Sequence, residues 1–398
     1  MQLALILPFV IVPFIFSHIG IYFGFMPNIP SSYERIKVQT FFILLIYALF
    51  CWFLYARSEI QFKKNRDIFL LVWIILWCFG IYLNTLPYPI DLIGTYEKYH
   101  GTLYYGSGII FFLLLSWHIH KKIDSNIKKW ILVTGILVSS VAILQLLWWD
   151  PLQQKYSHGG WDISRIFGTL WNPNYLAGYL LMIVPFIFTA GFPKITHFWI
   201  YILFSGVICA TGSVTGIILL GLYSLHIFIA HFCKKQKTQF IIWSILFSLF
   251  SSIIVWKYDI FQEKILSLQT RFAIWENTTE QIIQNPRILF FWNWPDSMAS
   301  YTSRNDHRNE NLKKYIQASD TLDSAHNIFL DIWFSFWIFG LIWFIIALWI
   351  PLRYTSKEKR DSILLFIGFF IFNIPVISHF ILLIYALVPL QKDKKNPQ

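Results

Sequence analysis

The sequence predicts an all-α polytopic integral membrane protein with about twelve transmembrane helices and one large outside loop that contains amphipathic helices. Two observations on composition lead to this fold class. Hydrophobic residues make up 56% of the chain and charged residues only 13%, where an average soluble domain carries about 25% charged residues. Apolar runs close to the ~20 residues that cross a bilayer recur along the chain, with short basic clusters between them. A soluble core cannot absorb this much apolar surface.

The predicted spans follow the apolar runs along the chain. The first run contains Pro8 and Pro13 but has no basic n-region and no cleavage site of the A-x-A type, so we expect a retained span. The last run is too long for one untilted span, and Asn373-Ile374-Pro375 predicts a break near its middle. The expected spans are 3–25, 38–56, 68–86, 103–119, 130–149, 174–190, 198–212, 214–232, 240–256, 327–351 and two shorter pieces within 362–390.

The basic clusters set the expected orientation. With both termini inside, the inside loops hold 19 of the 32 Lys and Arg residues, and by the positive-inside rule these loops are cytoplasmic. The clusters do not follow one amphipathic face, so they indicate topology, and we expect no nucleic-acid partner. The chain then divides into nine spans with short loops over 1–256, a large periplasmic or extracellular loop over 257–326, and three spans with a basic cytoplasmic tail over 327–398.

Function is expected in two outside segments, 150–173 and 257–326. In the longer segment, apolar residues at helical spacing predict an amphipathic helix from about 259 to 284, on the membrane surface or under a lid. The chain has no P-loop, no G-x-G-x-x-G, no C-x-x-C, no H-E-x-x-H and no D-x-D motif. These absences argue against nucleotide hydrolysis and zinc chemistry, and we expect neither a metal nor a cofactor.

Two arginines lie where a lipid-borne phosphate would be bound. Arg165 lies just upstream of a predicted helix start that Asn172 or Asn174 caps, and helix N-terminal amides together with a planar guanidinium suit a phosphate. Arg271 flanks the apolar stripe of the predicted surface helix. The alternative for both is structural, with the arginine extending from its helix to the lipid headgroups.

His326 and Asn327 open the tenth predicted span, at the outer rim of the membrane. A neutral imidazole there is a candidate proton acceptor for a sugar hydroxyl, beside Asp323 as a carboxylate partner. In the alternative, Asp323 or Ser324 caps the helix and His326 is a wetted residue of its first turn. Asp331 lies on the same helix face as Asn327 and is a candidate supporting partner.

Together these segments resemble the O-antigen ligase/polymerase superfamily, which includes O-antigen ligases, O-antigen polymerases and some protein-directed oligosaccharyltransferases. The resemblance covers roughly residues 130–350. It rests on the order and spacing of short motifs, which are Arg165-x-x-Gly168 followed by Asn172-Pro173-Asn174, Thr211-Gly212-Ser213-x-Thr215-Gly216, Arg271 in the long loop, and Ala325-His326-Asn327 at the start of a span.

The resemblance implies a metal-independent transfer of a glycan from a polyprenyl-pyrophosphate donor to an acceptor hydroxyl, at the outer face of the bacterial inner membrane. Carried over residue by residue, Arg165 and Arg271 bind the donor diphosphate and His326 activates the acceptor hydroxyl. The other residues expected to contact substrate are Asn172, Asn174, Arg304, Arg308, Asn327 and Asp323.

One departure from the family pattern concerns the arginine that commonly follows the serine of the Thr-Gly-Ser turn. This chain has Val214 there. Either another cation, such as Arg304 or Arg308, takes its place, or phosphate binding is altered.

The expected partners are the lipid-linked glycan donor, membrane lipid and an acceptor that is a glycolipid, a glycan or a protein. One large outside loop and twelve spans favour the O-antigen ligase reading, with the lipid A core as acceptor, over a polymerase or a protein O-oligosaccharyltransferase. A transporter or lipid flippase without catalysis is the alternative from another class, because the predicted spans contain His18, His226, Asp331 and His379. No repeat of broken helices in matching halves supports it.

Overall fold

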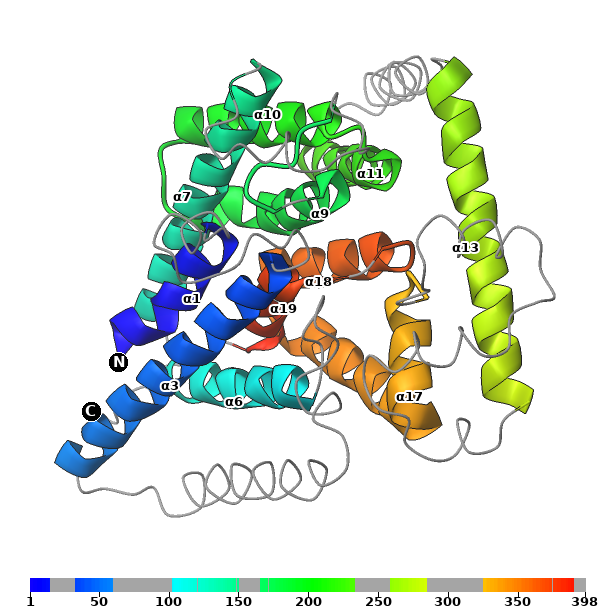
Figure 1. Cartoon of the computed structure of the whole chain (residues 1–398). Helices are drawn as coiled ribbons and strands as arrows, with labels where there is room; N and C mark the ends of the chain where they lie inside the picture. The colour runs from blue at the N-terminus through cyan, green and yellow to red at the C-terminus, as the bar shows by residue number, and fades with distance from the viewer. Residues whose placement is uncertain are drawn as a thin grey trace.

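The structure is a computed structural model that describes residues 1–14, 33–59, 102–119, 121–147, 149, 165–170, 172–232, 258–284, 325–373 and 375–389. In these residues all regular structure is helical, which confirms the all-α fold class (Figure 1). The elements are α1 (Gln2–Phe14), α3 (Tyr33–Glu59), α6 (Thr102–His118), α7 (Lys121–Leu146), α9 (Pro173–Ile183), the 3₁₀-helix η2 (Val184–Thr189), α10 (Lys194–Ala210), α11 (Val214–Phe232), α13 (Tyr258–Gln284), α17 (Ile328–Tyr354), α18 (Lys357–Phe370) and α19 (Ile377–Leu387).

The last two helices, α18 and α19, lie at the centre of the bundle (Figure 1). α18 contacts α9, η2, α11 and α17, while α19 contacts α1, α3, α6, α9 and α17. α13 lies at the edge of the bundle, where it contacts α17. The C-terminal part of the described chain therefore connects the N-terminal helices with the middle ones.

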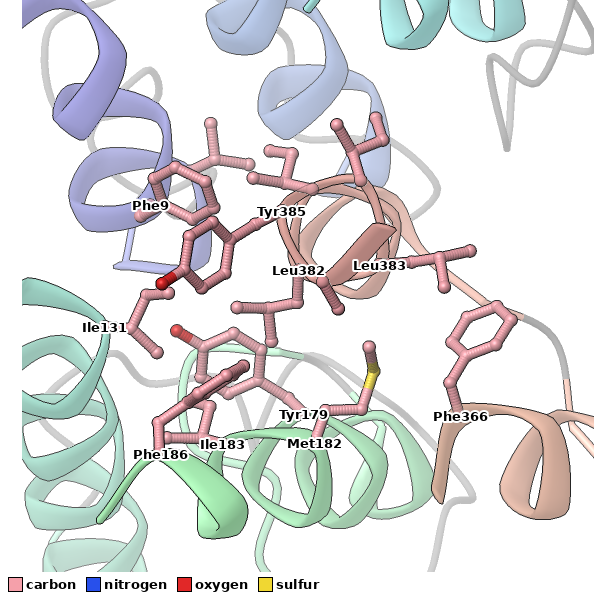
Figure 2. Packing of buried hydrophobic residues seen from close by; sticks show 14 of the residues in the cluster. Phe9, Ile131, Tyr179, Met182, Ile183, Phe186, Phe366, Leu382, Leu383 and Tyr385 are labelled. Atoms are coloured by element: carbon pink, nitrogen blue, oxygen red, sulfur yellow. The ribbon is translucent and has the colours of Figure 1, made fainter. Parts of the chain in front are cut away.

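Tyr385 of α19 is completely buried in this core, beside residues of α1, α7 and η2 (Figure 2). Its ring centroid lies 5.5 Å from that of Phe9 and 5.5 Å from that of Phe186. Aromatic pairs of this kind stabilise a fold by about 0.5–1.5 kcal/mol beyond the area they bury. Tyr179 of α9 and Ile131 of α7 line the same space (Figure 2).

The number of membrane spans is where structure and prediction differ. By length and composition, α7 is the one helix among the described residues that is able to cross a membrane, and the other apolar helical stretches have 10–17 residues. The described residues therefore do not support the predicted count of twelve. The predicted spans 68–86 and 240–256 lie outside them. The predicted span 174–190 divides into α9 and η2 at Pro185, which has no backbone N–H to continue the α-helical pattern.

Two local predictions are confirmed. α18 ends at Phe370 and α19 begins at Ile377, so the break predicted at Asn373-Ile374-Pro375 is present. The Asn373 side chain donates to the Phe369 carbonyl oxygen at 3.0 Å, which satisfies one of the carbonyl groups that a helix end leaves without an intrahelical partner. The predicted amphipathic helix of the long loop is α13.

A group of charged side chains joins the start of α7, the start of α18 and the end of α19. Lys128 lies 2.7 Å from Asp124 and 2.6 Å from Glu358, and Lys359 lies 2.9 Å from Asp124. The Tyr385 hydroxyl donates to the Asp124 carboxylate at 2.8 Å. We call these five residues the ion network.

Lys128 and Lys359 belong to basic clusters that predict cytoplasmic loops, and for these two residues the loop assignment is wrong. The Lys359 side chain is completely buried and that of Lys128 is nearly so. The expected loop is short because α17 ends at Tyr354 and α18 already begins at Lys357. An ammonium between apolar runs is stable in this interior because a carboxylate lies against it.

The lysines also affect the two carboxyl groups of the ion network. Burial raises the pKa of Asp124, but Lys359 and Lys128 together outweigh burial and hold that pKa below its ordinary value. Burial likewise raises the pKa of Glu358, and the hydrogen bond from Lys128 leads the effects that lower it overall. Both carboxyl groups are therefore charged at neutral pH.

Candidate functional site

The Arg165 side chain connects three segments that are separate in the sequence. Its Nε donates to the Thr211 carbonyl oxygen at 2.8 Å, and its Nη2 donates to the Asn174 side-chain oxygen at 3.4 Å. Thr211 follows α10 in the turn to α11, and Asn174 lies in the first turn of α9. The start of α9 and the α10–α11 turn thus meet at one guanidinium.

Two glycines of the motifs have backbone conformations that residues with a side chain rarely adopt. φ is 57° at Gly168 and 63° at Gly212. A Cβ atom at Gly212 would also lie 3.4 Å from the Arg165 Nε, in contact with the guanidinium. The glycines therefore shape the loops on either side of Arg165.

The N-cap of α9 is Asn172, which decides between the two predicted cap residues. Its side-chain oxygen accepts from the Asn174 backbone N–H at 2.8 Å, and Pro173 occupies the first turn, where a missing N–H is tolerated. The Asn174 side chain accepts from Arg165 instead of capping the helix. Helix N-terminal amides beside a guanidinium are a combination that favours an anion.

Gln145 of α7 forms hydrogen bonds with the backbone of the loop after Arg165. Its side-chain oxygen accepts from the backbone N–H groups of Phe167 at 3.2 Å and Gly168 at 2.8 Å, and its amide nitrogen donates to the Gly168 carbonyl oxygen at 3.1 Å. Gln145 is completely buried. The sequence reasoning missed this residue, although a polar side chain inside a predicted span is a signal that a polar partner lies nearby.

Lys37, near the start of α3, is a second residue that the sequence reasoning missed. It is 1% exposed, and its ammonium donates to the carbonyl oxygens of Thr169 at 2.9 Å and Pro13 at 3.1 Å. The Thr169 hydroxyl donates to the same Pro13 oxygen at 2.7 Å. Lys37 thereby joins the loop after Arg165 to α1 and α3.

Arg271 lies on α13 and reaches the turn between α18 and α19, where its Nη1 donates to the Phe372 carbonyl oxygen. Trp275, one helical turn further, packs on the Phe372 ring with the centroids 5.6 Å apart. The Trp275 indole N–H donates to the Ala325 carbonyl oxygen at 2.9 Å. One face of α13 thus contacts both the α18–α19 turn and the segment that leads into α17.

His326 lies immediately before α17, and Asn327 is the N-cap of that helix. The Asn327 side-chain oxygen accepts from two backbone N–H groups of the first turn, at 2.9 and 3.3 Å. The alternative in which Asp323 or Ser324 caps the helix is therefore wrong. Asn327 has a structural role as well as its predicted role in substrate binding.

The backbone of His326 has a φ of 52°, a conformation that costs a residue with a side chain of order 1–3 kcal/mol. The surrounding contacts fix the residue before it from both sides. The Ala325 N–H donates to the Asp331 carboxylate at 2.7 Å, and the Ala325 carbonyl accepts from Trp275. Asp331 therefore supports His326 through the Ala325 backbone.

The α18–α19 connection has contacts with α13 and with the start of α9. Phe372 accepts from Arg271 on one side. On the other, the His379 Nε2 lies 2.8 Å from the Tyr175 carbonyl oxygen, and the Val376 N–H donates to the His379 Nδ1 at 3.1 Å. Because Nδ1 accepts, Nε2 carries the proton and donates to Tyr175. His379 therefore fixes α19 to the start of α9.

Several predicted residues lie outside the described part of the chain. These are Asp323, Arg304 and Arg308, so their roles stay predictions. Val214, which replaces the family arginine, is the first residue of α11. Over the residues that the structure describes, no group of three or more His, Cys, Asp or Glu side chains is placed to hold a metal ion.

Comparisons of the chain with protein-family models, with curated proteins and with solved structures give no match. The candidate site thus rests on its sequence motifs and its geometry. The Arg271 guanidinium contacts the α18–α19 turn, and the Arg165 guanidinium contacts the start of α9, which His379 joins to α19. Trp275 joins the same turn to Ala325, the residue before His326. Such a set of groups suits an anion with several oxygen atoms, beside a hydroxyl that loses a proton.

Proposed function

We propose that this protein is a multi-pass membrane glycan transferase of the O-antigen ligase type, with its site at the periplasmic face of the bacterial inner membrane. The observation that supports this most strongly is the position of Arg165, in contact with both Thr211 and Asn174. These residues come from two of the short motifs on which the resemblance to the O-antigen ligase/polymerase superfamily rests, the one that runs from Arg165 to Asn174 and the one that begins at Thr211. Chance matches to short motifs give no reason for them to meet.

In this proposal, Arg165 and Arg271 bind the diphosphate of a polyprenyl-linked glycan. The contacts described for each guanidinium orient it: Thr211 and Asn174 accept from Arg165, and Phe372 accepts from Arg271. The positive end of the α9 helix dipole adds to the attraction for a phosphate.

His326 accepts the proton of the acceptor hydroxyl while the acceptor oxygen attacks the anomeric carbon of the donor sugar. The bond between that carbon and the diphosphate oxygen breaks, and its electron pair leaves with the polyprenyl pyrophosphate. The arginines stabilise the growing negative charge of the leaving group. A single displacement inverts the anomeric centre, and no nucleotide is consumed in this step.

Exposed apolar side chains support a lipid environment for the described helices, and the set of twelve spans stays a proposal. On α17, Phe339, Trp343 and Trp349 are more than half exposed, and on α10 the same holds for Phe198 and Trp199. Apolar residues gathered in this way are rare on a water-exposed surface and ordinary on a lipid-facing one. α17 has 27 residues, about 40 Å of helix, which is longer than the roughly 30 Å hydrocarbon core of a bilayer.

The decisive experiment supplies purified protein with a radiolabelled polyprenyl-pyrophosphate glycan and an acceptor. We expect release of polyprenyl pyrophosphate together with a labelled product. Movement of intact donor across a vesicle membrane, without release, would instead indicate a transporter. Offering the lipid A core, a free glycan and a protein as acceptors in parallel separates the ligase from the polymerase and the protein-directed transferase.

The orientation has its own test. Single cysteines at Ser303 and Ser356 are labelled in intact spheroplasts with a membrane-impermeant thiol reagent. We expect label at position 303, in the large loop, and none at 356, in the connection between α17 and α18. The reverse pattern would mean that the topology is inverted.

A further inference from the structure

The Arg271–Trp275 face of α13 contacts both parts of the candidate site. Arg271 donates to Phe372, and Trp275, four residues later on the same helix face, packs on the Phe372 ring and donates to Ala325. The Trp275 indole N–H donates to the Ala325 carbonyl, which belongs to the peptide bond between Ala325 and His326. The orientation of that peptide bond determines where the imidazole lies.

The hydrogen bonds from Arg271 and Trp275 are directional contacts, because each one ends on a backbone carbonyl group of a short connecting segment. The Ala325 N–H donates to Asp331, and the indole N–H is the described contact to the Ala325 carbonyl. Loss of that contact would remove one restraint on the peptide that leads into His326 and on the left-handed conformation of that residue.

We propose that Trp275 is a positioning residue that makes the placement of His326 depend on donor binding at Arg271. The inference rests on the proposed function and specifies the order of substrate binding. A diphosphate is a charged acceptor and competes with the neutral Phe372 carbonyl for the Arg271 guanidinium. The resulting shift of α13 reaches Ala325 through Trp275, so donor binding tightens the contact that already holds the Ala325 carbonyl and fixes the proton acceptor more firmly before the acceptor hydroxyl arrives.

The test uses the variant Trp275→Phe, which keeps an aromatic ring against Phe372 and removes the indole N–H together with the five-membered ring. Trp333→Phe on α17 is the matched control, because its buried Nε1 has no hydrogen-bond partner among the described residues. Hydrogen exchange of the peptide 325–331 is measured in the full-length, detergent-solubilised protein, with and without saturating undecaprenyl pyrophosphate. Probe binding is measured separately with radiolabelled undecaprenyl pyrophosphate.

We expect the probe to slow exchange over 325–331 in the parent protein and in Trp333→Phe but not in Trp275→Phe, which still binds the probe. In the transfer assay, Trp275→Phe should lower kcat roughly 2- to 10-fold, the effect of one lost hydrogen bond, and leave the KM for donor unchanged. A merely structural tryptophan would change thermal stability without removing the exchange response.

An unchanged response in Trp275→Phe would overturn the inference, and so would a parent protein that binds the probe without any change over 325–331. A parent protein that does not bind the probe at all would overturn the proposed donor site itself, and the inference with it. If Trp275→Phe does not fold, Arg271→Gln at saturating probe takes its place. This variant should bind through Arg165 and lack the response, and a response equal to the parent's would again overturn the inference.

Discussion

The ion network and the candidate site lie at opposite ends of the same helices and satisfy their charges in different ways. In the ion network, Lys128 and Lys359 lie against Asp124 and Glu358, so two positive charges meet two negative ones. In the candidate site, the contacts described for the two arginines are with carbonyl and amide oxygens. The first arrangement pairs cations with carboxylates, and the described contacts of the second orient guanidinium groups through backbone and amide oxygens.

This difference teaches how to tell a structural cluster of charge from a binding site. A network of paired charges at the junction of three helices has no charge left for a ligand, and its expected effect is on stability. A guanidinium held by neutral oxygens is oriented and still attracts an anion. The predictions below separate these two roles, from the largest expected effect to the smallest.

Replacing His326 by Ala should have the largest effect, a loss of roughly 10²–10⁴-fold in turnover with donor binding intact, which is the range for a general base. Transfer by purified protein is measured across pH, beside donor binding. His197→Ala on α10 is the control and should retain turnover. Turnover of His326→Ala within a few-fold of the parent would leave His326 a structural residue and make Asp323 the next candidate.

Replacing Lys359 by Met should lower the stability of the protein by about 3–5 kcal/mol, because it leaves Asp124 buried with one of its two ammonium partners missing. Turnover per folded molecule should stay unchanged. Thermal and denaturant unfolding in detergent measure the first effect, and Lys357→Met, at an exposed neighbouring position, is the control. A folded Lys359→Met protein without turnover would show that the ion network takes part in catalysis.

Replacing Arg165 or Arg271 by Lys should lower activity at limiting donor by roughly ten- to a hundred-fold, as expected for one lost charge-assisted contact. The charge is unchanged in these variants, but lysine lacks the planar fork that binds two oxygens at once. Arg360→Lys, at an exposed position of α18, is the matched control. Full activity of both site variants would rule out a direct contact with the diphosphate.

Acid should weaken the ion network before it affects the rest of the described core. The pKa values of Asp124 and Glu358 lie below their ordinary values in the folded protein, so the unfolded chain binds more protons than the folded one in acid. Their contribution to stability is complete above the ordinary carboxyl pKa and is lost as the pH falls through the folded values. Thermal unfolding measured from pH 7 to well below the ordinary carboxyl pKa should show a weaker dependence on pH for Glu358→Gln than for the parent, and an equal dependence would contradict this assignment.

The sequence predicts the helical ranges of the described chain well, because long apolar runs separated by polar turns leave few alternatives. The α18–α19 break and the helix α13 follow from local signals, the Asn-Ile-Pro triplet and an apolar stripe at helical spacing. The motif residues around Arg165 are also local, and their convergence adds geometry to a prediction already made.

The contacts that hold the site are not local, and this is why they escape the sequence. Lys37 binds Thr169, 132 residues away, and Tyr385 binds Asp124, 261 residues away. A lysine between apolar runs looks the same whether it faces water or a buried carboxylate, so Lys359 resembles an ordinary topology signal. Gln145 and Lys37 show that polar residues in or beside an apolar run are the places to search for such contacts.

The position of α19 has a consequence for how the protein is made. This helix carries Tyr385, which completes the ion network, and His379, which binds the start of α9, so both ends of the bundle depend on a helix that leaves the ribosome after the other described helices. Until then Lys359 lacks the Val388 carbonyl that accepts from it at 3.0 Å, and Asp124 lacks the Tyr385 hydroxyl. A chain that stops before α19 therefore exposes unsatisfied polar groups at both ends, a mark by which cellular quality control can recognise unfinished copies.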